Sequence, residues 1–364
     1  MPQAAAPIAF ALLALPLTGT ADSGAAMVLA MTGAQVIGAV PVTRMSRRFS
    51  TTGAVRLLVA IRTLALIATA LLSHLQLPFA LLIAAAALAG VVSGAAYGHM
   101  RTALNTVVRP AGLPRALGIA ATMNEVVFVS APALASLLGS VSAPAAVLAL
   151  GILGAGSLAL LPPAPRSSTD AAAPHAAEPA GPAARRRPGL ITPEIGLWLW
   201  CAMAGSAAVA GIEVGAVSLA IRFGLDPAAG FLFATTLCLA SVAGGVWVSV
   251  RNRTSRQGIV VLQLLVTTIG TVLIAFGPAL WSTLLGAVLV GALLAPLGTH
   301  YSLALDRLAP PLRRAEVFAL LRTAQSLGII TVSGLLTLTS LEVALAGSSV
   351  LMATAAVAAA ARLR

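Results

Sequence analysis

Long, uninterrupted apolar runs occupy most of the chain. Each run holds about 20 residues, the length an α-helix needs to cross ~30 Å of hydrocarbon. Their continuity contrasts with the strict apolar-polar alternation of half-buried strands. We therefore predict an all-α integral membrane protein with about twelve transmembrane helices. The predicted spans are Ala5–Thr20, Ser23–Thr43, Ala54–Leu72, Pro78–Met100, Ala116–Leu138, Ser142–Leu161, Leu197–Ile221, Ala228–Val250, Ile259–Phe276, Trp281–Leu303, Val317–Leu338 and Val343–Ala361.

The arginines between these spans fall on one side only. One alternate set of gaps contains Arg44, Arg47, Arg48, Arg56, Arg101, Arg109, Arg115, Arg166, Arg185, Arg186, Arg187, Arg251, Arg253, Arg256, Arg307, Arg313, Arg314, Arg362 and Arg364. The opposite set has only Arg222 at an edge. Positive residues remain on the cytoplasmic side of membrane proteins. We therefore expect the first set of gaps, and both termini, to lie in the cytoplasm.

One gap differs from the others in length and composition. Residues 163–192 are rich in proline, alanine and arginine and contain too few apolar side chains to form a core. We interpret this segment as a flexible cytoplasmic linker. It would divide the chain into two six-helix halves, residues 1–162 and 193–364.

Composition excludes several classes of protein. Hydrophobic residues make up 59% of the chain, charged residues 9%, and the mean hydropathy is +0.99, which is incompatible with a soluble domain. The net charge of +12 comes from arginines in short gaps between spans, so it indicates membrane topology and not nucleic-acid binding. The sequence contains no Lys, so it has no Walker-type nucleotide loop. It also shows no metal-ligand cluster and no catalytic constellation, and we expect neither an enzyme nor a cofactor or metal.

The two predicted halves share a weak internal repeat. Gly90, His99 and Asn105 lie in and just after the fourth span, and Gly291, His300 and Asp306 occupy matching positions around the tenth. The paired histidines are the stronger evidence, because the chain has only four. Internal repeats of this kind are typical of two-domain transporters.

The turn after the second span carries a family likeness. Arg44, Arg47 and Arg48 match the loop signature Gly-x-x-x-Asp-Arg-x-Gly-Arg-Arg, while Ala39, Thr43 and Ser46 replace its glycines and its acid. Asn124 to Pro132 in the fifth span is similar to a stretch found in actinobacterial export-type proteins. With its two six-span halves, the chain resembles the major facilitator superfamily. In that family the missing acid helps to latch the cytoplasmic gate.

The resemblance implies a multi-pass protein of the bacterial cytoplasmic membrane that works as a monomer by alternating access. Its expected partners are a small-molecule substrate, the proton gradient and the lipid bilayer. It also implies that Arg44, Arg47 and Arg48 form a cytoplasmic gate loop. From the residues alone, these arginines are topology determinants and contacts for anionic lipids.

Two acidic residues lie deep in predicted spans. Glu125 is ten residues beyond Arg115, ~15 Å along a helix, and Glu213 lies nine residues before Arg222. Ionisable groups at such depth cost ~3 kcal/mol or more, so each is a functional candidate. We expect both to carry protons, with Asn124 beside the first. The alternative is a neutral acid in a structural hydrogen bond between helices.

Other polar residues in the spans are candidates for the substrate site. Arg322 lies ~12 Å from Arg314 along the eleventh span, with Gln325 one turn on, and it would either pair with a cavity carboxylate or reach back to the surface. His99 and His300, near the ends of spans four and ten, would relay protons or, the interpretation we favour, be wetted from the cytoplasm. The further cavity candidates are Gln35, Tyr97 and Asn105.

We therefore expect a secondary active transporter that exports a small amphipathic or drug-like compound in exchange for protons. One alternative is an uncoupled facilitator or importer on the same fold. Another is a non-transporting membrane receptor or scaffold, supported only by the eroded loop signature.

Overall fold

The chain folds into helices joined by short connections. The computed structural model describes residues 2–18, 22–139, 142–160, 190–253 and 255–362, and no strand occurs among them. The helices are α1 Pro2–Thr18, α2 Asp22–Ser46, α3 Thr51–His74, α4 Phe79–Val107, α5 Leu113–Gly139, α6 Ala143–Leu160, α7 Pro193–Glu213, α8 Ala216–Arg222, α9 Phe231–Arg251, α10 Gln257–Phe276, α11 Leu280–Leu308, α12 Arg314–Leu338 and α13 Leu341–Ala361. Short 3-10 helices precede α5, α9 and α12.

These helices confirm the predicted all-α fold. In the described parts of the chain, nine helices are long and apolar enough to cross a membrane. The helices α1, α5 and α6 coincide with the three remaining predicted spans. Most of the predicted linker, residues 163–189, lies outside the described residues.

The seventh predicted span is wrong in one respect, because it is interrupted. Helix α7 ends at Glu213, Val214 and Gly215 form a turn, and α8 begins at Ala216. A methyl group on Gly215 would collide with the carbonyl oxygen of Gly211 and would lie 3.1 Å from Leu341 Cδ1. The apolar run continues through the turn, so hydropathy alone could not detect this break.

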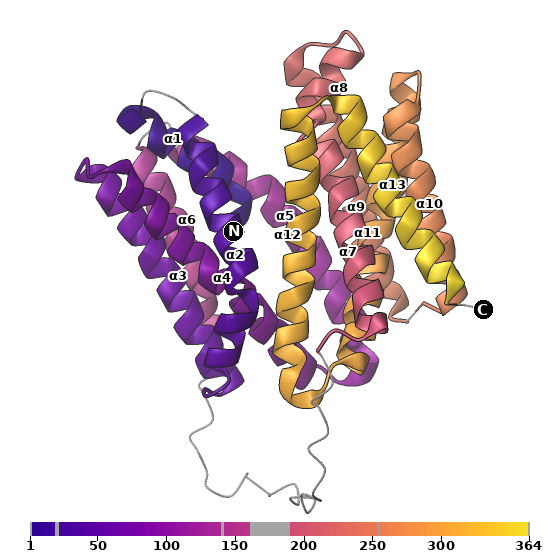
Figure 1. Cartoon of the computed structure of the whole chain (residues 1–364), viewed down its shortest axis with the longest axis horizontal. Coiled ribbons are helices and arrows are strands. Elements are labelled where there is room, and N and C mark those ends of the chain that lie inside the picture. Colours follow the sequence, from indigo (N-terminus) through magenta and orange to yellow (C-terminus); the bar gives the residue numbers. More distant parts are fainter. Residues whose placement is uncertain (1, 19–21, 140–141, 161–189, 254, 363–364) are drawn as a thin grey trace, which may run out of the picture.

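The helices form two groups, which we call the first half (α1–α6) and the second half (α7–α13). Apolar clusters bury side chains from Ala5 to Val147 in the first half and from Ile195 to Ala359 in the second. Figure 1 shows the two groups side by side, close together at one end and diverging toward the other. Each half therefore has a core of its own.

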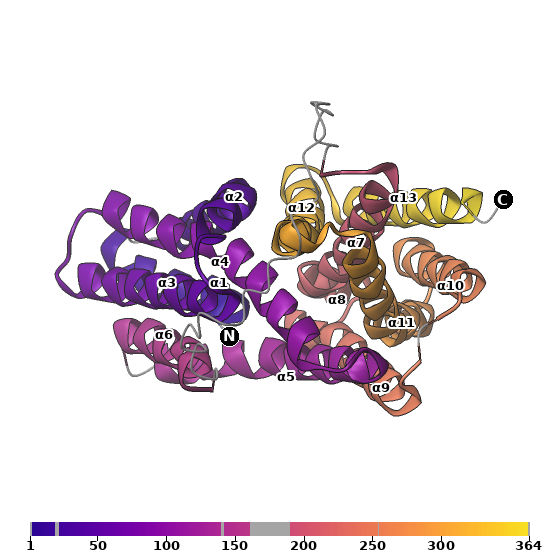
Figure 2. The same ribbon diagram turned by 90° about the horizontal axis from the view of Figure 1, so that it is seen from below.

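Contacts between the halves involve few helices. Helix α12 packs against α2 and α4, and α5 packs against α9 and α11. Helices α3 and α6 lie at the outer edge of the first half, and α10 and α13 at that of the second (Figure 2). The central helices α2, α4, α5, α9, α11 and α12 thus carry the residues that can join the halves or line a space between them.

Large apolar side chains cover the outside of the bundle. Ile37 is 78% exposed, Val357 67% and Leu239 65%, and many other large apolar side chains are similarly exposed. Exposed apolar surface of this extent is unfavourable in water and is stable against lipid tails. The exposure pattern agrees with the membrane environment predicted from hydropathy.

Candidate functional site

The halves meet at the end of the bundle where α2, α4, α9 and α11 finish. We call it the arginine-rich end. Glu316, in the first turn of α12, is fully buried there. Its carboxylate forms ion pairs with three arginines. Arg44 Nε lies 3.3 Å from Oε2, Arg47 Nη1 3.0 Å from Oε1, and Arg313 Nη2 2.9 Å from Oε2. We call this group the Glu316 latch, because it joins α2 of the first half to α12 of the second.

The latch explains the missing acid in the turn after α2. Thr43 occupies the position of the family's aspartate, and its hydroxyl donates within its own helix to Ala39 O at 2.6 Å. The carboxylate comes instead from the other half, through Glu316. Sequence reasoning missed this residue. The available signal was a single acid that closely follows two arginines at the start of an apolar run.

A second polar contact lies beside the latch. Asn105 Nδ2 on α4 donates to Asp306 Oδ1 on α11 at 2.7 Å, and Arg314 Nε lies 3.6 Å from the same oxygen. Asn105 and Asp306 are equivalent positions of the internal repeat. The structure therefore brings repeat partners into direct contact across the junction of the halves.

The turn after α9 makes the corresponding contact from the second half. Asn252, in the left-handed conformation at φ 45°, accepts from the backbone N–H of Arg115 at 3.0 Å through Oδ1. Its Nδ2 donates to Ala111 O at 2.8 Å. The amide thus caps the start of α5, as the Glu316 latch holds the start of α12. The Asn252 contact is made by a neutral amide, whereas the Glu316 latch is made by charged groups.

Glu125 lies farther into the bundle, along the seam between α5 and α9. Gly118 and Thr122 precede it on the same face of α5, and both approach the backbone of Gly245 on α9. One turn deeper, the Glu125 carboxylate is within hydrogen-bonding reach of Ser241 on α9. Glu125 therefore contacts the other half at a point about 18 Å along α5 from its start.

Glu213 approaches the same place from α7. Its carboxylate is close enough to that of Glu125 for the two charges to repel, and Cys238 on α9 is within range of both. Glu213 is the last residue of α7, directly before the helix break, and its side chain is exposed. The structure thus brings together the two acids that the sequence singled out. Asn124, next to the first, is exposed.

Arg322 belongs to a different cluster, between α12 and α4. Its guanidinium carbon lies 5.9 Å from the ring centre of Tyr97, and Nη1 lies 3.5 Å from Gln325 Oε1. One turn along, Gln35 Nε2 on α2 donates to Ser326 Oγ at 2.8 Å. Gln35 is fully buried, so in this state it lies within the contact between the halves and not on an open surface.

The two repeat histidines pack inside their own halves. His99 is only 5% exposed, and Nε2 lies 2.8 Å from Ser46 Oγ, so it is buried against α2 and not wetted as expected. His300 packs edge-on against Trp198, with ring centres 4.8 Å apart. Arg48 is exposed in the turn after α2. Within the described residues, no group of three or more His, Cys, Asp or Glu side chains is arranged to hold a metal ion.

Solved structures share this arrangement of helices. A bacterial homologue of the iron transporter ferroportin, in an outward-facing state, has 13% identity and a TM-score of 0.75, with 98% of this chain and 96% of that chain covered. The proton:xylose symporter bound to 6-bromo-6-deoxy-D-glucose has 11% identity and a TM-score of 0.75, covering 97% and 91%. The Escherichia coli fucose:proton symporter has 12% identity and a TM-score of 0.71, covering 99% and 95%. At such identities the likeness concerns the fold.

The sequence itself identifies the family. No curated protein matches it. The family model of the Major Facilitator Superfamily, however, matches residues 3–333, which is nearly the whole chain and includes both halves. Its members are transporters and not enzymes. The chain therefore belongs to the major facilitator superfamily of membrane transporters.

Proposed function

We propose that this transporter exports a small amphipathic or drug-like compound in exchange for protons. The observation that carries the proposal is the pair Glu125 and Glu213, one carboxylate from each half, close enough to interact. Acids inside a membrane protein are costly and mark proton or ion pathways. Because one acid of the pair belongs to each half, protonation of the pair would be coupled directly to movement of the halves.

The link follows from electrostatics. Two ionised carboxylates repel each other more strongly as the halves approach, because the distance between the charges falls. A proton on either acid removes that repulsion, so the pair binds protons as a unit. Proton binding and release would thus favour different separations of α5 and α7. The division of the chain into two domains, residues 1–162 and 193–364, is part of this proposal.

The proposed exchange assigns a side of the membrane to each binding step. The positive-inside rule assigns the arginine-rich end to the cytoplasm, and the Glu316 latch and the Asn252 contact close that end in the described state. In this state protons would reach the acids from the outside. The compound would bind from the cytoplasm after the latches open. The fold likeness to a protein described in an outward-facing state supports this assignment.

The site favours a compound with both apolar and polar parts. Glu125 and Glu213 supply negative groups, Arg322 and Gln325 supply a positive and a neutral one, and the helices that carry these residues are mostly apolar. A cationic amphipathic compound would replace protons at the acids. Such competition between substrate and proton is sufficient for exchange.

Reconstitution into proteoliposomes with an imposed pH gradient tests the proposal. We expect addition of a transported compound from a cationic and amphipathic panel to dissipate the gradient. Glu125→Gln and Glu213→Gln, which keep the shape and remove the charge, should reduce this coupled proton flux at least about tenfold, because a positioned proton-transfer group typically contributes about a hundredfold or more. Glu342→Gln is the matched control, because Glu342 is an exposed acid at the start of α13.

The other outcomes identify other functions. Transport at an unchanged rate in both Gln variants would contradict proton coupling and indicate a facilitator. Saturable binding without flux, in wild-type protein, would instead indicate a receptor or scaffold on the same fold.

A further inference from the structure

The Glu316 latch contains more positive charge than its single carboxylate neutralises. Three guanidinium groups, those of Arg44, Arg47 and Arg313, share Glu316. Among the described residues, these three arginines therefore carry two more positive charges than the carboxylate that they share. Like charges held close together are unfavourable unless a counter-charge binds between or beside them.

The arginines also retain free donors. Arg44 uses Nε and Arg47 uses Nη1 in the contacts with Glu316, whereas a guanidinium carries five N–H groups. The side chains of Arg44, Arg47 and Arg313 are 52%, 42% and 25% exposed, while Glu316 is fully buried beneath them. Each arginine thus contacts the carboxylate on its inner side and can bind an anion on its outer side.

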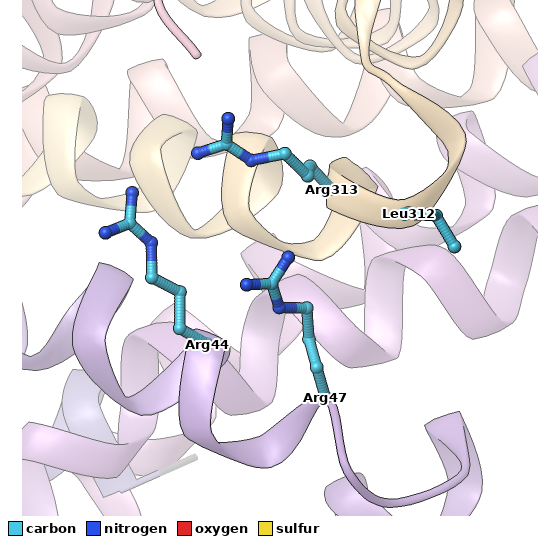
Figure 3. A pocket seen from close by; sticks show the side chains of 4 residues that line it. All are labelled: Arg44, Arg47, Leu312 and Arg313. Atoms are coloured by element: carbon cyan, nitrogen blue, oxygen red, sulfur yellow. The ribbon is translucent and has the colours of Figure 1, made fainter. Parts of the chain in front are cut away.

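The outer sides face one pocket. Arg44, Arg47, Arg313 and Leu312 line a cavity of about 600 Å³. Figure 3 shows Arg44, on α2, and Arg47, in the turn directly after it, reaching toward Arg313, whose guanidinium lies across the cavity from them. The volume is large enough for a phosphate group, and bidentate guanidinium donors match phosphate oxygens well. Leu312, at the rim, is 87% exposed.

We propose that this pocket binds the phosphate group of an anionic ligand and thereby stabilises the state in which the arginine-rich end is closed. The ligand class is a phosphate monoester or diester, either an anionic phospholipid headgroup or soluble phosphate. Arg44 and Arg47 belong to the first half, and Leu312 and Arg313 to the second. The pocket is complete only when the halves are together, so a ligand that binds it must favour that state.

Binding can be measured directly on the full-length protein. Native mass spectrometry in detergent would count bound phosphatidylglycerol and phosphatidylcholine. We expect phosphatidylglycerol to bind preferentially and Arg47→Gln to weaken this binding about tenfold, as expected for loss of one charge-assisted hydrogen bond. Arg48→Gln is the matched control. It removes the same charge from the same turn, but Arg48 does not line the pocket.

A distance measurement reports the effect on conformation. Spin labels at Val107→Cys on α4 and Val250→Cys on α9, with Cys201→Ser and Cys238→Ser, place one probe on each half near the arginine-rich end. We expect nanodiscs with phosphatidylglycerol to increase the short-distance population relative to pure phosphatidylcholine. If inorganic phosphate added to phosphatidylcholine nanodiscs gives the same increase, the ligand is soluble phosphate; if it does not, the ligand is the lipid.

Two results would overturn the proposal. One is equal binding of phosphatidylglycerol to Arg47→Gln and Arg48→Gln, which would indicate a diffuse charge effect. The other is a distance distribution between the two spin labels that changes neither with phosphatidylglycerol nor with inorganic phosphate. If Arg47→Gln fails to fold, Arg44→Gln replaces it, because Arg47 and Arg313 would still hold Glu316. The proposal does not depend on proton coupling, so Glu125→Gln should bind the same lipid.

Discussion

Glu316 is the residue on which the charged contacts at the arginine-rich end converge. It is fully buried and its two oxygens face three guanidinium groups from both halves. Removing one partner of a buried charge pair costs more than the pair itself contributes, because the remaining charges lose their counter-charge. At the scale of single residues, Glu316 therefore controls the closed state more strongly than any one of its arginines.

This gives a prediction for Glu316→Gln. The change leaves three arginines without an acid, so the closed state should lose about 1–3 kcal/mol relative to the open one. In the background of Cys201→Ser and Cys238→Ser, a cysteine at Ser326→Cys, buried between the halves, should then react about 5-fold to 150-fold faster with a thiol reagent.

The control for this prediction is Glu342→Gln, which removes an exposed acid from α13. A labelling rate at position 326 that is equal in the two variants would show that Glu316 does not hold the halves together.

Helix packing across the junction depends on small residues. Gly98 on α4 lies against Ala315 and Ala319 at the start of α12, and Gly118 on α5 lies against Ser249 on α9. These contacts bring two backbones together, which is possible only where a side chain is absent. At the scale of elements, glycines therefore set how closely α4 approaches α12 and α5 approaches α9.

We expect Gly98→Ala to weaken closure without unfolding either half. Its methyl group would collide with the carbonyl oxygen of Ala315 in the other half, at a cost of about 1–3 kcal/mol. The spin-label pair at positions 107 and 250 should show a larger long-distance population.

Gly205→Ala is the matched control for this change. Gly205 lies on α7, and an added methyl group there would have no heavy atom within 4 Å. An unchanged distance distribution in Gly98→Ala would contradict the role given to this glycine.

The whole molecule is a pair of six-span halves, and the turns after α2 and α9 contact the opposite half in unequal ways at the arginine-rich end. The turn after α2 uses charges on the start of α12, and the equivalent turn after α9 uses the neutral amide of Asn252 on the start of α5. Charged contacts respond to ions and ligands, whereas neutral amide contacts respond much less. We infer that regulation of closure concentrates on the α2–α12 side.

The orientation of the molecule is predicted by its arginines and is open to direct test. Single cysteines at Arg256→Cys, at the arginine-rich end, and His74→Cys, at the opposite end, would be placed in the Cys201→Ser, Cys238→Ser background. A membrane-impermeant thiol reagent should label the first only in inverted vesicles and the second only in right-side-out vesicles. Labelling with the opposite sidedness would reverse the assignment of the arginine-rich end and the proposed direction of transport.

The sequence alone determined the features that depend on local composition. An apolar run of about 20 residues is stable as a membrane helix whatever surrounds it, so the spans could be located from hydropathy. The family likeness also rests on sequence, through the match over residues 3–333. Glu125, Glu213 and Arg322 were visible as candidates because charged residues are rare in such runs.

Only the tertiary structure decided which of these residues meet. Sequence separation gives no distance between helices, so it could not pair Glu125 with Ser241 and Glu213, or separate both from the Arg322 cluster. It missed Glu316, because an acid beside arginines at a helix start is ordinary until another half brings two more arginines to it. It also missed the break after Glu213, because the backbone turn keeps the apolar composition of the span. Contacts between distant segments are set by packing, and packing is not encoded in any one window of the chain.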